Sequence, residues 1–270
     1  MLTDEQKQKM QEQNKKMTDT MNKIKHRIVV FSGKGGVGKT IVSVNLSYGL
    51  HTAGYKTGIL DADVTGPNVP KMVGGGGELN ALNDQIIPDQ CHGIQVVSVA
   101  YMLPENQPVM WRGPMRSKLL YQFLGDVAWG DLDYLIADLP PGTGDDIITL
   151  SEKMMPELAV IVTTPQEVAL LDSARSINMA KEMKIPKIGL VENMSGLSCP
   201  KCGHKIDLFG MGGGKKQAEE MGVEFLGAIS IDVEARKMAD YGTPIILENP
   251  KAIVSMEIND IVKNIINMLN

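Results

Sequence analysis

A glycine-rich segment, GKGGVGKT, runs from Gly33 to Thr40 directly after the apolar run IVVF. Glycine has no Cβ, so a segment this rich in glycine can curl until its backbone N–H groups point at a common centre. The residues that follow have helical spacing, and the N-terminus of a helix favours an anion at the same place. A strand, such a loop and a helix in succession therefore predict a site for phosphate groups.

The spacing of this segment fits the P-loop pattern, in which Gly33 is followed after four residues by Gly38, Lys39 and Thr40. Lys39 is placed to reach the β and γ phosphates of a nucleotide, and the hydroxyl of Thr40 to ligate Mg²⁺. A glycine turn without a nucleotide is the alternative, but the strand before the loop and the helix after it argue against that alternative. We expect ATP to bind through the whole loop, namely Gly33, Lys34, Gly35, Gly36, Val37, Gly38, Lys39 and Thr40.

The bulk composition narrows the class of protein. Of the 270 residues, 43% are hydrophobic and 22% are charged, which is ordinary for a globular chain with a sizeable core. The formal net charge of -5 disfavours a general nucleic-acid binder. The polar N-terminus is unlike a signal peptide, and no stretch reaches the ~18 apolar residues of a membrane span. Three cysteines make no disulfide framework. We expect a cytoplasmic protein with neither DNA nor a membrane as partner.

Short apolar runs rich in Val and Ile alternate with stretches of helical spacing. Such runs are typical of strands covered on both faces, and the alternation implies a parallel sheet with right-handed crossovers. We predict an α/β fold with three layers, in which a mainly parallel central sheet is flanked by helices. The expected strands are residues 27–31, 57–60, 95–100, 134–137, 159–163, 187–191 and 225–228, and helices are expected at 40–53, 114–128, 168–183 and 214–221.

The first 24 residues form a polar lead rich in Gln and Lys, and we interpret residues 25–270 as one P-loop ATPase domain with a metal-binding cysteine loop. Met10, Met17 and Ile24 recur every seven residues, which could mark one face of a helix. Three such positions do not support a coiled coil. We expect residues 1–24 to be a frayed or loosely docked helix, or disordered.

Two expected strands end in acidic residues. ILDAD ends with Asp61 and Asp63, and YLIAD ends with Asp138. Side chains at the carboxyl ends of parallel strands face the ligand crevice of an α/β sheet. Asp138 follows an apolar strand as a Walker B acid does, and we expect it to hold Mg²⁺, directly or through water. Asp61 is interpreted as a supporting residue, and each of these acids could instead cap the next helix.

A pair of cysteines, Cys199 and Cys202, lies two residues apart in the polar segment SCPKCGHK. This spacing lets two thiolates converge on one metal centre, but zinc and iron–sulfur sites usually have four ligands. Within one chain only Cys91 and His204 could add to the pair, and we expect Cys91 to be a packed residue and His204 no ligand. The simplest completion is a homodimer in which each chain supplies both cysteines about a two-fold axis. A thioredoxin-like redox pair, a zinc site and inert thiols are the alternatives.

The early lysine of the loop, Lys34, makes GKGGVGKT resemble the deviant Walker A motif of the ParA, MinD and nitrogenase-iron-protein ATPases. The resemblance implies that Lys34 reaches across a dimer to the partner's nucleotide. It also assigns Asp63 to switch I, where an aspartate positions or activates the attacking water. Lys34, Lys39, Asp63 and Asp138 then form the catalytic set.

Two further segments match the same group of ATPases. PPGTGD, residues 140–145, looks like switch II, a loop whose shape depends on the γ-phosphate. Asn193 matches the asparagine that contacts adenine, and its amide offers both a donor and an acceptor to the base. A solvated lysine at position 34 and an asparagine that satisfies its own turn are the plainer alternatives.

Several segments together resemble the Mrp/ApbC-type iron–sulfur cluster carriers, namely GKGGVGKT, DADVTGPNVP, WRGPM, DLPPGTGD and VENMSGLSCPKCGHKIDLFG. The resemblance runs from about Lys25 to the end of the chain. It implies a homodimer that binds ATP and Mg²⁺, the metal through Thr40 and Asp138. It further implies that Cys199 and Cys202 hold a labile [4Fe–4S] cluster, which passes to apo iron–sulfur client proteins with slow, linked ATP hydrolysis. Some relatives carry an extra N-terminal domain or four-cysteine motif, whereas this lead has no cysteine.

Two other functions fit parts of the sequence. A positioning ATPase of the MinD/ParA type would need no cysteine pair and would use a membrane or DNA surface. An ATP-linked electron-transfer protein similar to the nitrogenase iron protein would hold a stable cluster, but the ligand cysteines of that protein are widely separated in sequence. The adjacent pair at Cys199 and Cys202 therefore favours the carrier.

Overall fold

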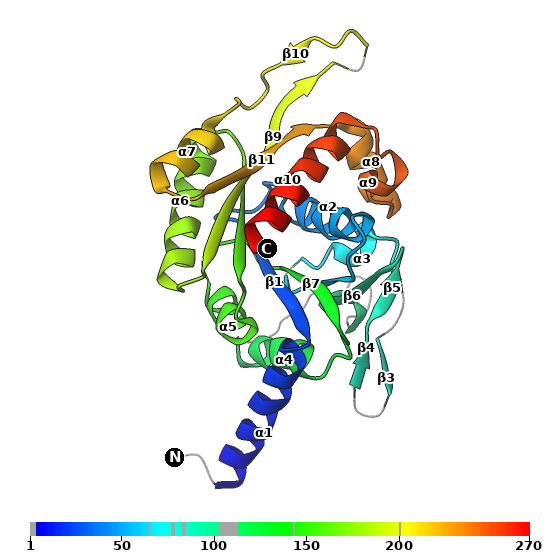
Figure 1. Ribbon diagram of the computed structural model, residues 1–270, viewed down its shortest axis with the longest axis vertical. Coiled ribbons are helices and arrows are strands. Elements are labelled where there is room, and N and C mark those ends of the chain that lie inside the picture. Colours follow the sequence, from blue (N-terminus) through cyan, green and yellow to red (C-terminus); the bar gives the residue numbers. More distant parts are fainter. Residues whose placement is uncertain are drawn as a thin grey trace.

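The computed structural model describes residues 4–64, 66–76, 79–82, 85–102, 113–142, 144–199 and 201–270. Its centre is a nine-stranded sheet in the order β10-β9-β8-β1-β7-β2-β6-β5, with β11 paired to β9 (Figure 1). The inner pairs and the β9–β11 pair are parallel, whereas β5 and β10 run antiparallel to their neighbours. The strands are β1 Ile24–Phe31, β2 Thr57–Asp61, β5 Asp89–Cys91, β6 Ile94–Ser98, β7 Leu132–Asp138, β8 Leu158–Thr163, β9 Lys187–Ser198, β10 Lys205–Ile206 and β11 Glu224–Ile231.

Helices cover both faces of this sheet because the inner strands are apolar on both faces. All six residues of β8 are buried, as are the last four of β1. One buried cluster joins the sheet to α1, α4, α5, α6 and α7, and a second joins it to α2, α3, α8, α9 and α10. The helices are α1 Asp4–Met21, α2 Lys39–Thr52, α3 Val69–Met72, α4 Gly113–Gly125, α5 Asp145–Met154, α6 Glu167–Glu182, α7 Gly213–Met221, α8 Val233–Tyr241, α9 Ile245–Glu248 and α10 Ile253–Leu269. The predicted three-layer α/β fold is confirmed.

The structure departs from the sequence-based predictions mainly at the edges of the sheet. Strand β6 ends at Ser98, and the residues expected to continue it form a short 3-10 helix, η1 Val99–Met102. Strand β9 continues through the polar residues up to Ser198, because β10 and β11 pair with it beyond the point where β8 ends. A separate hairpin is made by β3 Asn80–Leu82 and β4 Gln85–Ile87.

Helix α1 is docked through its C-terminal half. Met17 and Met21 are buried, whereas Met10 is 53% exposed. The hydroxyl of Thr20 donates to the Gly125 carbonyl at the end of α4 (3.1 Å). The seven-residue spacing of Met10, Met17 and Ile24 does not mark one face of a helix, because α1 ends at Met21 and Ile24 belongs to β1. The N-terminal half of α1 extends away from the body of the molecule (Figure 1).

Among the helices that the structure describes, none is long and apolar enough to cross a bilayer.

Candidate functional site

The phosphate loop joins the carboxyl end of β1 to α2. Gly36 and Gly38 both have φ of 82°, a left-handed conformation that favours glycine, and Gly38 is the residue that precedes the helix. Gly33 is fixed for another reason: a Cβ there would lie 2.2 Å from the carbonyl oxygen of Asp172 in α6. The start of the loop therefore packs closely against α6, and the end of the loop leads directly into α2. The side chain of Val37, within the loop, is buried.

The polar side chains of the loop and of the first turn of α2 converge on one buried carboxylate at the end of β7. Asp138 has no exposed surface, and its Oδ2 lies 2.8 Å from Lys39 Nζ and accepts a hydrogen bond from Thr40 Oγ1 (2.7 Å). Its Oδ1 accepts from Ser43 Oγ (2.6 Å). The structure thus brings together the three residues predicted to serve phosphate and metal. Ser43 was missed, although it stands one helical turn after Lys39 and therefore on the same face of α2.

The two acids after β2 have different surroundings. Asp61 is fully buried, and its carboxylate accepts hydrogen bonds from Ser98 Oγ (2.9 Å), Val69 N (3.2 Å) and Asp63 N (3.3 Å). Burial, and after it the charge of Asp138, raise the pKa of Asp61 to about 8. Asp61 therefore holds the chain around Asp63 in place, as its interpretation as a supporting residue requires.

Asp63 lines the same cavity as the phosphate loop. This cavity is lined by Gly35, Gly38, Lys39 and Thr40 of the loop, and by Asp63, Asn68 and Pro141. The Asp63 carboxylate accepts a hydrogen bond from Gly66 N (3.2 Å). A carboxylate at this position faces the space where the phosphates of a nucleotide would lie.

The segment after β7 is tied to the phosphate loop by main-chain hydrogen bonds. Leu139 N donates to the Val30 carbonyl (2.9 Å) and Gly142 N to the Ser32 carbonyl (2.8 Å). Ser32 Oγ in turn donates to the carbonyl of Lys34, whose side chain is partly exposed at the start of the loop. Thr143 of the expected switch II segment, and Trp111 and Arg112 of the WRGPM motif, lie outside the described residues.

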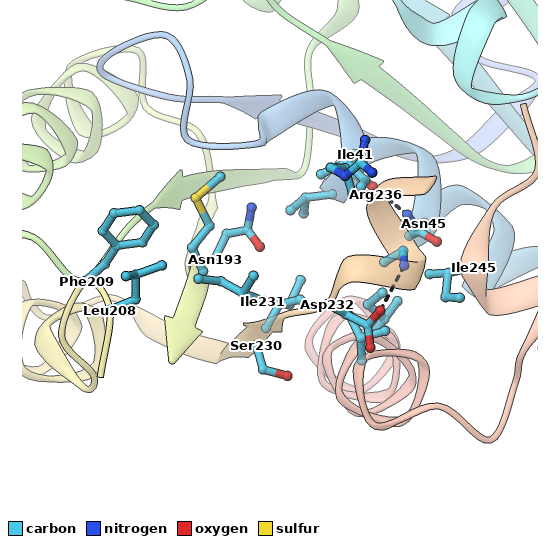
Figure 2. A pocket seen from close by; sticks show the side chains of 16 residues that line it. Ile41, Asn45, Asn193, Leu208, Phe209, Ser230, Ile231, Asp232, Arg236 and Ile245 are labelled. Atoms are coloured by element: carbon cyan, nitrogen blue, oxygen red, sulfur yellow. Dashed lines mark hydrogen bonds between the residues drawn. The ribbon is translucent and has the colours of Figure 1, made fainter. Parts of the chain in front are cut away.

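A second cavity, of about 320 Å³, adjoins the loop and is almost entirely apolar. Asn193 lines this cavity, and its Nδ2 donates to the Val37 carbonyl (2.8 Å). Figure 2 shows Leu208 and Phe209 on one side of Asn193 and Ile41 on the other. Only Asn193 of this set was predicted to contact the base. Met194, Leu208 and Phe209 lie within the segment VENMSGLSCPKCGHKIDLFG, which was noted for its family resemblance and not for a contact with the base. The other apolar residues come from α2, β11, α8, α9 and α10.

The cysteine pair lies at the turn of a hairpin formed by β9 and β10, which extends away from the sheet (Figure 1). Cys199 is partly exposed and Cys202 is exposed. The turn is closed by two main-chain bonds, Gly203 N to the Cys199 carbonyl (2.8 Å) and Cys199 N to the His204 carbonyl (2.9 Å). Hydrogen bonds from the backbone of Lys201 and Cys202 lower the pKa of the Cys199 thiol, which favours the thiolate that binds metals.

The structure places no further metal ligands around the pair among the residues it describes. Across the part of the chain that the structure describes, no group of three or more His, Cys, Asp and Glu side chains could hold a metal ion. Cys91 is buried and contacts Asp89 Oδ2 (3.5 Å), at the far edge of the sheet from the hairpin. Cys91 is thus a packed residue, as expected.

Fold and phosphate loop together define a P-loop NTPase with a parallel sheet. Comparison with known proteins assigns the chain more closely. A family profile described as ParA, NUBPL iron-transfer P-loop NTPase, matches residues 23–266, and the chain belongs to this family. The resemblance drawn from the sequence motifs is confirmed.

Individual relatives agree with this assignment. The chain is 49% identical to the iron–sulfur cluster carrier protein of Methanocaldococcus jannaschii, over 96% of this chain and 90% of that one. It is 45% identical to the carrier protein of Deinococcus radiodurans, over 90% of this chain and 69% of that one. A nucleotide-binding protein of Archaeoglobus fulgidus, solved in complex with ADP, superposes with a TM-score of 0.79 at 37% identity and covers 90% of this chain and 96% of its own. The cell-division protein MinD of Aquifex aeolicus (TM-score 0.64, 20% identity, covering 90% and 97%) shares the fold.

Proposed function

We propose that this chain is an ATP-dependent iron–sulfur cluster carrier. Two copies hold one labile [4Fe–4S] cluster between them through Cys199 and Cys202, and pass it to apo-proteins. The proposal is supported by the family and by relatives named as iron–sulfur cluster carriers at 45–49% identity. It places the protein in the cytoplasm, without DNA or a membrane as partner.

The isolated cysteine pair is the observation that carries this proposal. A [4Fe–4S] cluster is held by four thiolates, and one chain presents two of them on an exposed turn. The described residues offer no further group of ligands nearby. A second copy related by a two-fold axis supplies the missing pair without any new ligand type. An exposed site also suits a cargo that must be handed on, because a client's thiolates can reach it.

Nucleotide chemistry is assigned to the loop and the acids around it. The triphosphate lies in the cavity between Gly35, Lys39 and Asp63, and the base in the apolar cavity beside Asn193. Lys39, which contacts Asp138 here, exchanges this contact for the β and γ phosphates when ATP binds. Asp63 positions or activates the attacking water, and Lys34 acts on the nucleotide of the partner subunit.

The residues present fit a magnesium ion. The Thr40 hydroxyl and Asp138 carboxylate are oxygen donors of the kind that Mg²⁺ prefers, and they already lie in contact. When bound, Mg²⁺ neutralises charge on the transferred phosphoryl group. Ser43 keeps the second carboxylate oxygen of Asp138 turned toward α2, so the first remains directed at Thr40.

Cluster transfer is the experiment that tests this function. The reduced protein is reconstituted anaerobically with iron and sulfide, and then mixed with an apo-enzyme whose activity requires a [4Fe–4S] cluster. The wild type should gain visible absorbance and about two irons per chain, and should restore the apo-enzyme. A Cys199→Ala/Cys202→Ala variant should do neither, whereas Cys91→Ala is the matched control and should behave as the wild type.

Two outcomes would contradict the proposal. Zinc in the wild type after anaerobic, iron-replete purification would assign the cysteines to a structural metal. A cluster that cycles between redox states but does not leave the protein would favour an electron-transfer ATPase.

A further inference from the structure

One strand carries the residue assigned to the base and leads directly into the cysteine turn, because β9 ends at Ser198, next to Cys199. Strand β9 pairs with β8 as far as Glu192, and Asn193 is the next residue. Its register with β11 also shifts here, because Asn193 lies opposite Ile229 but Leu197 lies opposite Ile231. The strand therefore loses its β8 neighbour at the apolar cavity and continues, paired with β11 and β10, as the first leg of the cysteine hairpin.

The backbone of this leg is bent at the cavity wall. Met194 has φ of 59° and Gly196 has φ of 76°, so two residues within three positions adopt the left-handed conformation. Met194 also lines the cavity. A non-glycine residue in this conformation is held by its surroundings, which here are the cavity and the hairpin.

The second leg of the hairpin returns to the same cavity. After β10, which pairs with β9 through Lys205 and Ile206, the chain contributes Leu208 and Phe209 to the cavity wall. Figure 2 shows both side chains beside Asn193, opposite Ile41 of α2 and Ile231 of β11. Both legs of the cysteine hairpin thus border the space assigned to the base.

A buried carboxylate ties the two legs together at their roots. Glu192 has no exposed surface and accepts hydrogen bonds from Gly212 N (2.9 Å) and Gly214 N (2.6 Å) on the return side. It also accepts from Ser195 Oγ (2.6 Å) on the outgoing side. Because Glu192 holds the two legs together where they join the rest of the sheet, a displacement of either leg at the cavity should also move the cysteine turn.

We infer that Phe209 and Leu208 are base-contacting residues of the nucleotide site, so that the cysteine hairpin responds to the base and not only to the phosphates. This inference rests on the proposed function, in that ATP must occupy the site. Phe209 is partly exposed, and its ring meets an otherwise apolar cavity that suits a flat, aromatic purine. The phosphates lie on the other side of Asn193, against the loop that its amide holds.

The test compares two ligands that share the phosphates but differ in the base. Alkylation rates of Cys199 and Cys202 are measured by mass spectrometry on the reduced, cluster-free chain, with Mg²⁺ plus ADP and with Mg²⁺ plus pyrophosphate. ADP should change the rates by up to about fivefold, the limit reached when the whole free energy of one aromatic stacking contact is passed to the hairpin. Pyrophosphate should bind but leave the rates at their nucleotide-free values.

Substitutions of Phe209 test whether the thiol response to ADP depends on this side chain of the cavity wall. Phe209→Ala should weaken ADP binding about fivefold, abolish the ADP effect on the thiols and leave pyrophosphate binding unchanged. Phe209→Leu keeps an apolar wall and should show a partial loss, which also carries the test if the alanine variant unfolds. Tyr241→Ala is the matched control, because this ring is 79% exposed at the end of α8 and outside the cavity.

Failure of this inference differs from failure of the proposed function. If pyrophosphate alone reproduces the ADP effect, or if Phe209→Ala responds as the wild type does, the base contact is wrong while nucleotide binding stands. If neither ligand binds the wild type, the proposed function fails and this inference falls with it.

Discussion

Asp61 and Asp138 lie opposite each other at the ends of β2 and β7, and both side chains are fully buried. Two carboxylates so placed do not share one role. Asp138 forms an ion pair with Lys39 and accepts hydrogen bonds from Thr40 and Ser43. Asp61 accepts hydrogen bonds from one hydroxyl and two backbone amides. The first set suits a group that serves phosphate and metal, and the second suits one that fixes a loop.

The raised pKa of Asp61 predicts a pH dependence of stability. Its pKa moves from 3.8 to about 8 on folding, so the folded chain holds a proton that the unfolded chain releases. The stability from this group is complete below about pH 4 and is lost as the pH rises through about 8.

The Asp61→Asn variant has no carboxyl at this position, so its stability should not fall in this way as the pH rises. The free energy of unfolding of the variant, relative to the wild type, should rise between about pH 5 and about pH 8 by at most about 1.4 kcal/mol per unit. Urea unfolding at several pH values measures it. A difference that does not depend on pH would contradict the assignment.

Ser43 offers a test of how Asp138 is positioned. Ser43→Ala removes the hydrogen bond to Asp138 Oδ1 and should weaken Mg²⁺-dependent nucleotide binding about tenfold. Ser47→Ala is the control, because Ser47 is equally buried one turn later but donates to the Ser43 carbonyl instead. Titration calorimetry with ADP, with and without Mg²⁺, separates the two variants; equal losses would indicate general damage to α2.

At the scale of elements, α1 shows how a polar segment can be docked by a few side chains. Two of its residues, Met17 and Met21, are buried and lie four positions apart, and therefore on one face of the helix. They pack into the core cluster that includes Leu119 and Phe123 of α4. The rest of the helix is largely polar, and this polar sequence is the reason that a loosely docked helix is expected from the sequence.

The docking of α1 predicts unequal effects of two similar substitutions. Met21→Ala should lower the free energy of unfolding by about 2–4 kcal/mol, because it removes most of a fully buried side chain and leaves a cavity in the core. Met10→Ala, at an exposed position of the same helix, should change it by less than about 0.5 kcal/mol. Chemical denaturation of both variants measures this, and equal small effects would show that α1 contributes nothing to the core.

The inner strands and the phosphate loop could be predicted because local pattern and final structure agree there: buried parallel strands are apolar on both faces, and the loop has a fixed spacing. Other features have no such local signal. The end of β9 is polar and becomes a strand only because β10 and β11 pair with it. Phe209 joins the cavity through the return of the hairpin, a contact that depends on tertiary structure.

At the scale of the whole molecule, the proposed function places a nucleotide site and a cysteine site in each chain and has a second copy complete both. Lys34 lies at the start of the phosphate loop, and the hairpin extends from the far end of β9 (Figure 1). In the proposed homodimer, which shares both sites, nucleotide state would be coupled to the distance between the two cysteine pairs.

Lys34 should therefore matter for association more than for binding. Lys34→Ala should bind ATP within about threefold of the wild type and lose ATP-dependent dimerisation, which light scattering detects. Lys25→Ala, at the opposite end of β1, is the control and should dimerise normally. A Lys34 variant that dimerises with ATP as the wild type does would remove this lysine from the interface.

The mass of the reconstituted protein under native, anaerobic conditions tests the shared cluster most directly. The account predicts a species of two chains with one [4Fe–4S] cluster, and loss of that species in Cys199→Ala/Cys202→Ala. A single chain that carries a complete cluster by itself would contradict it.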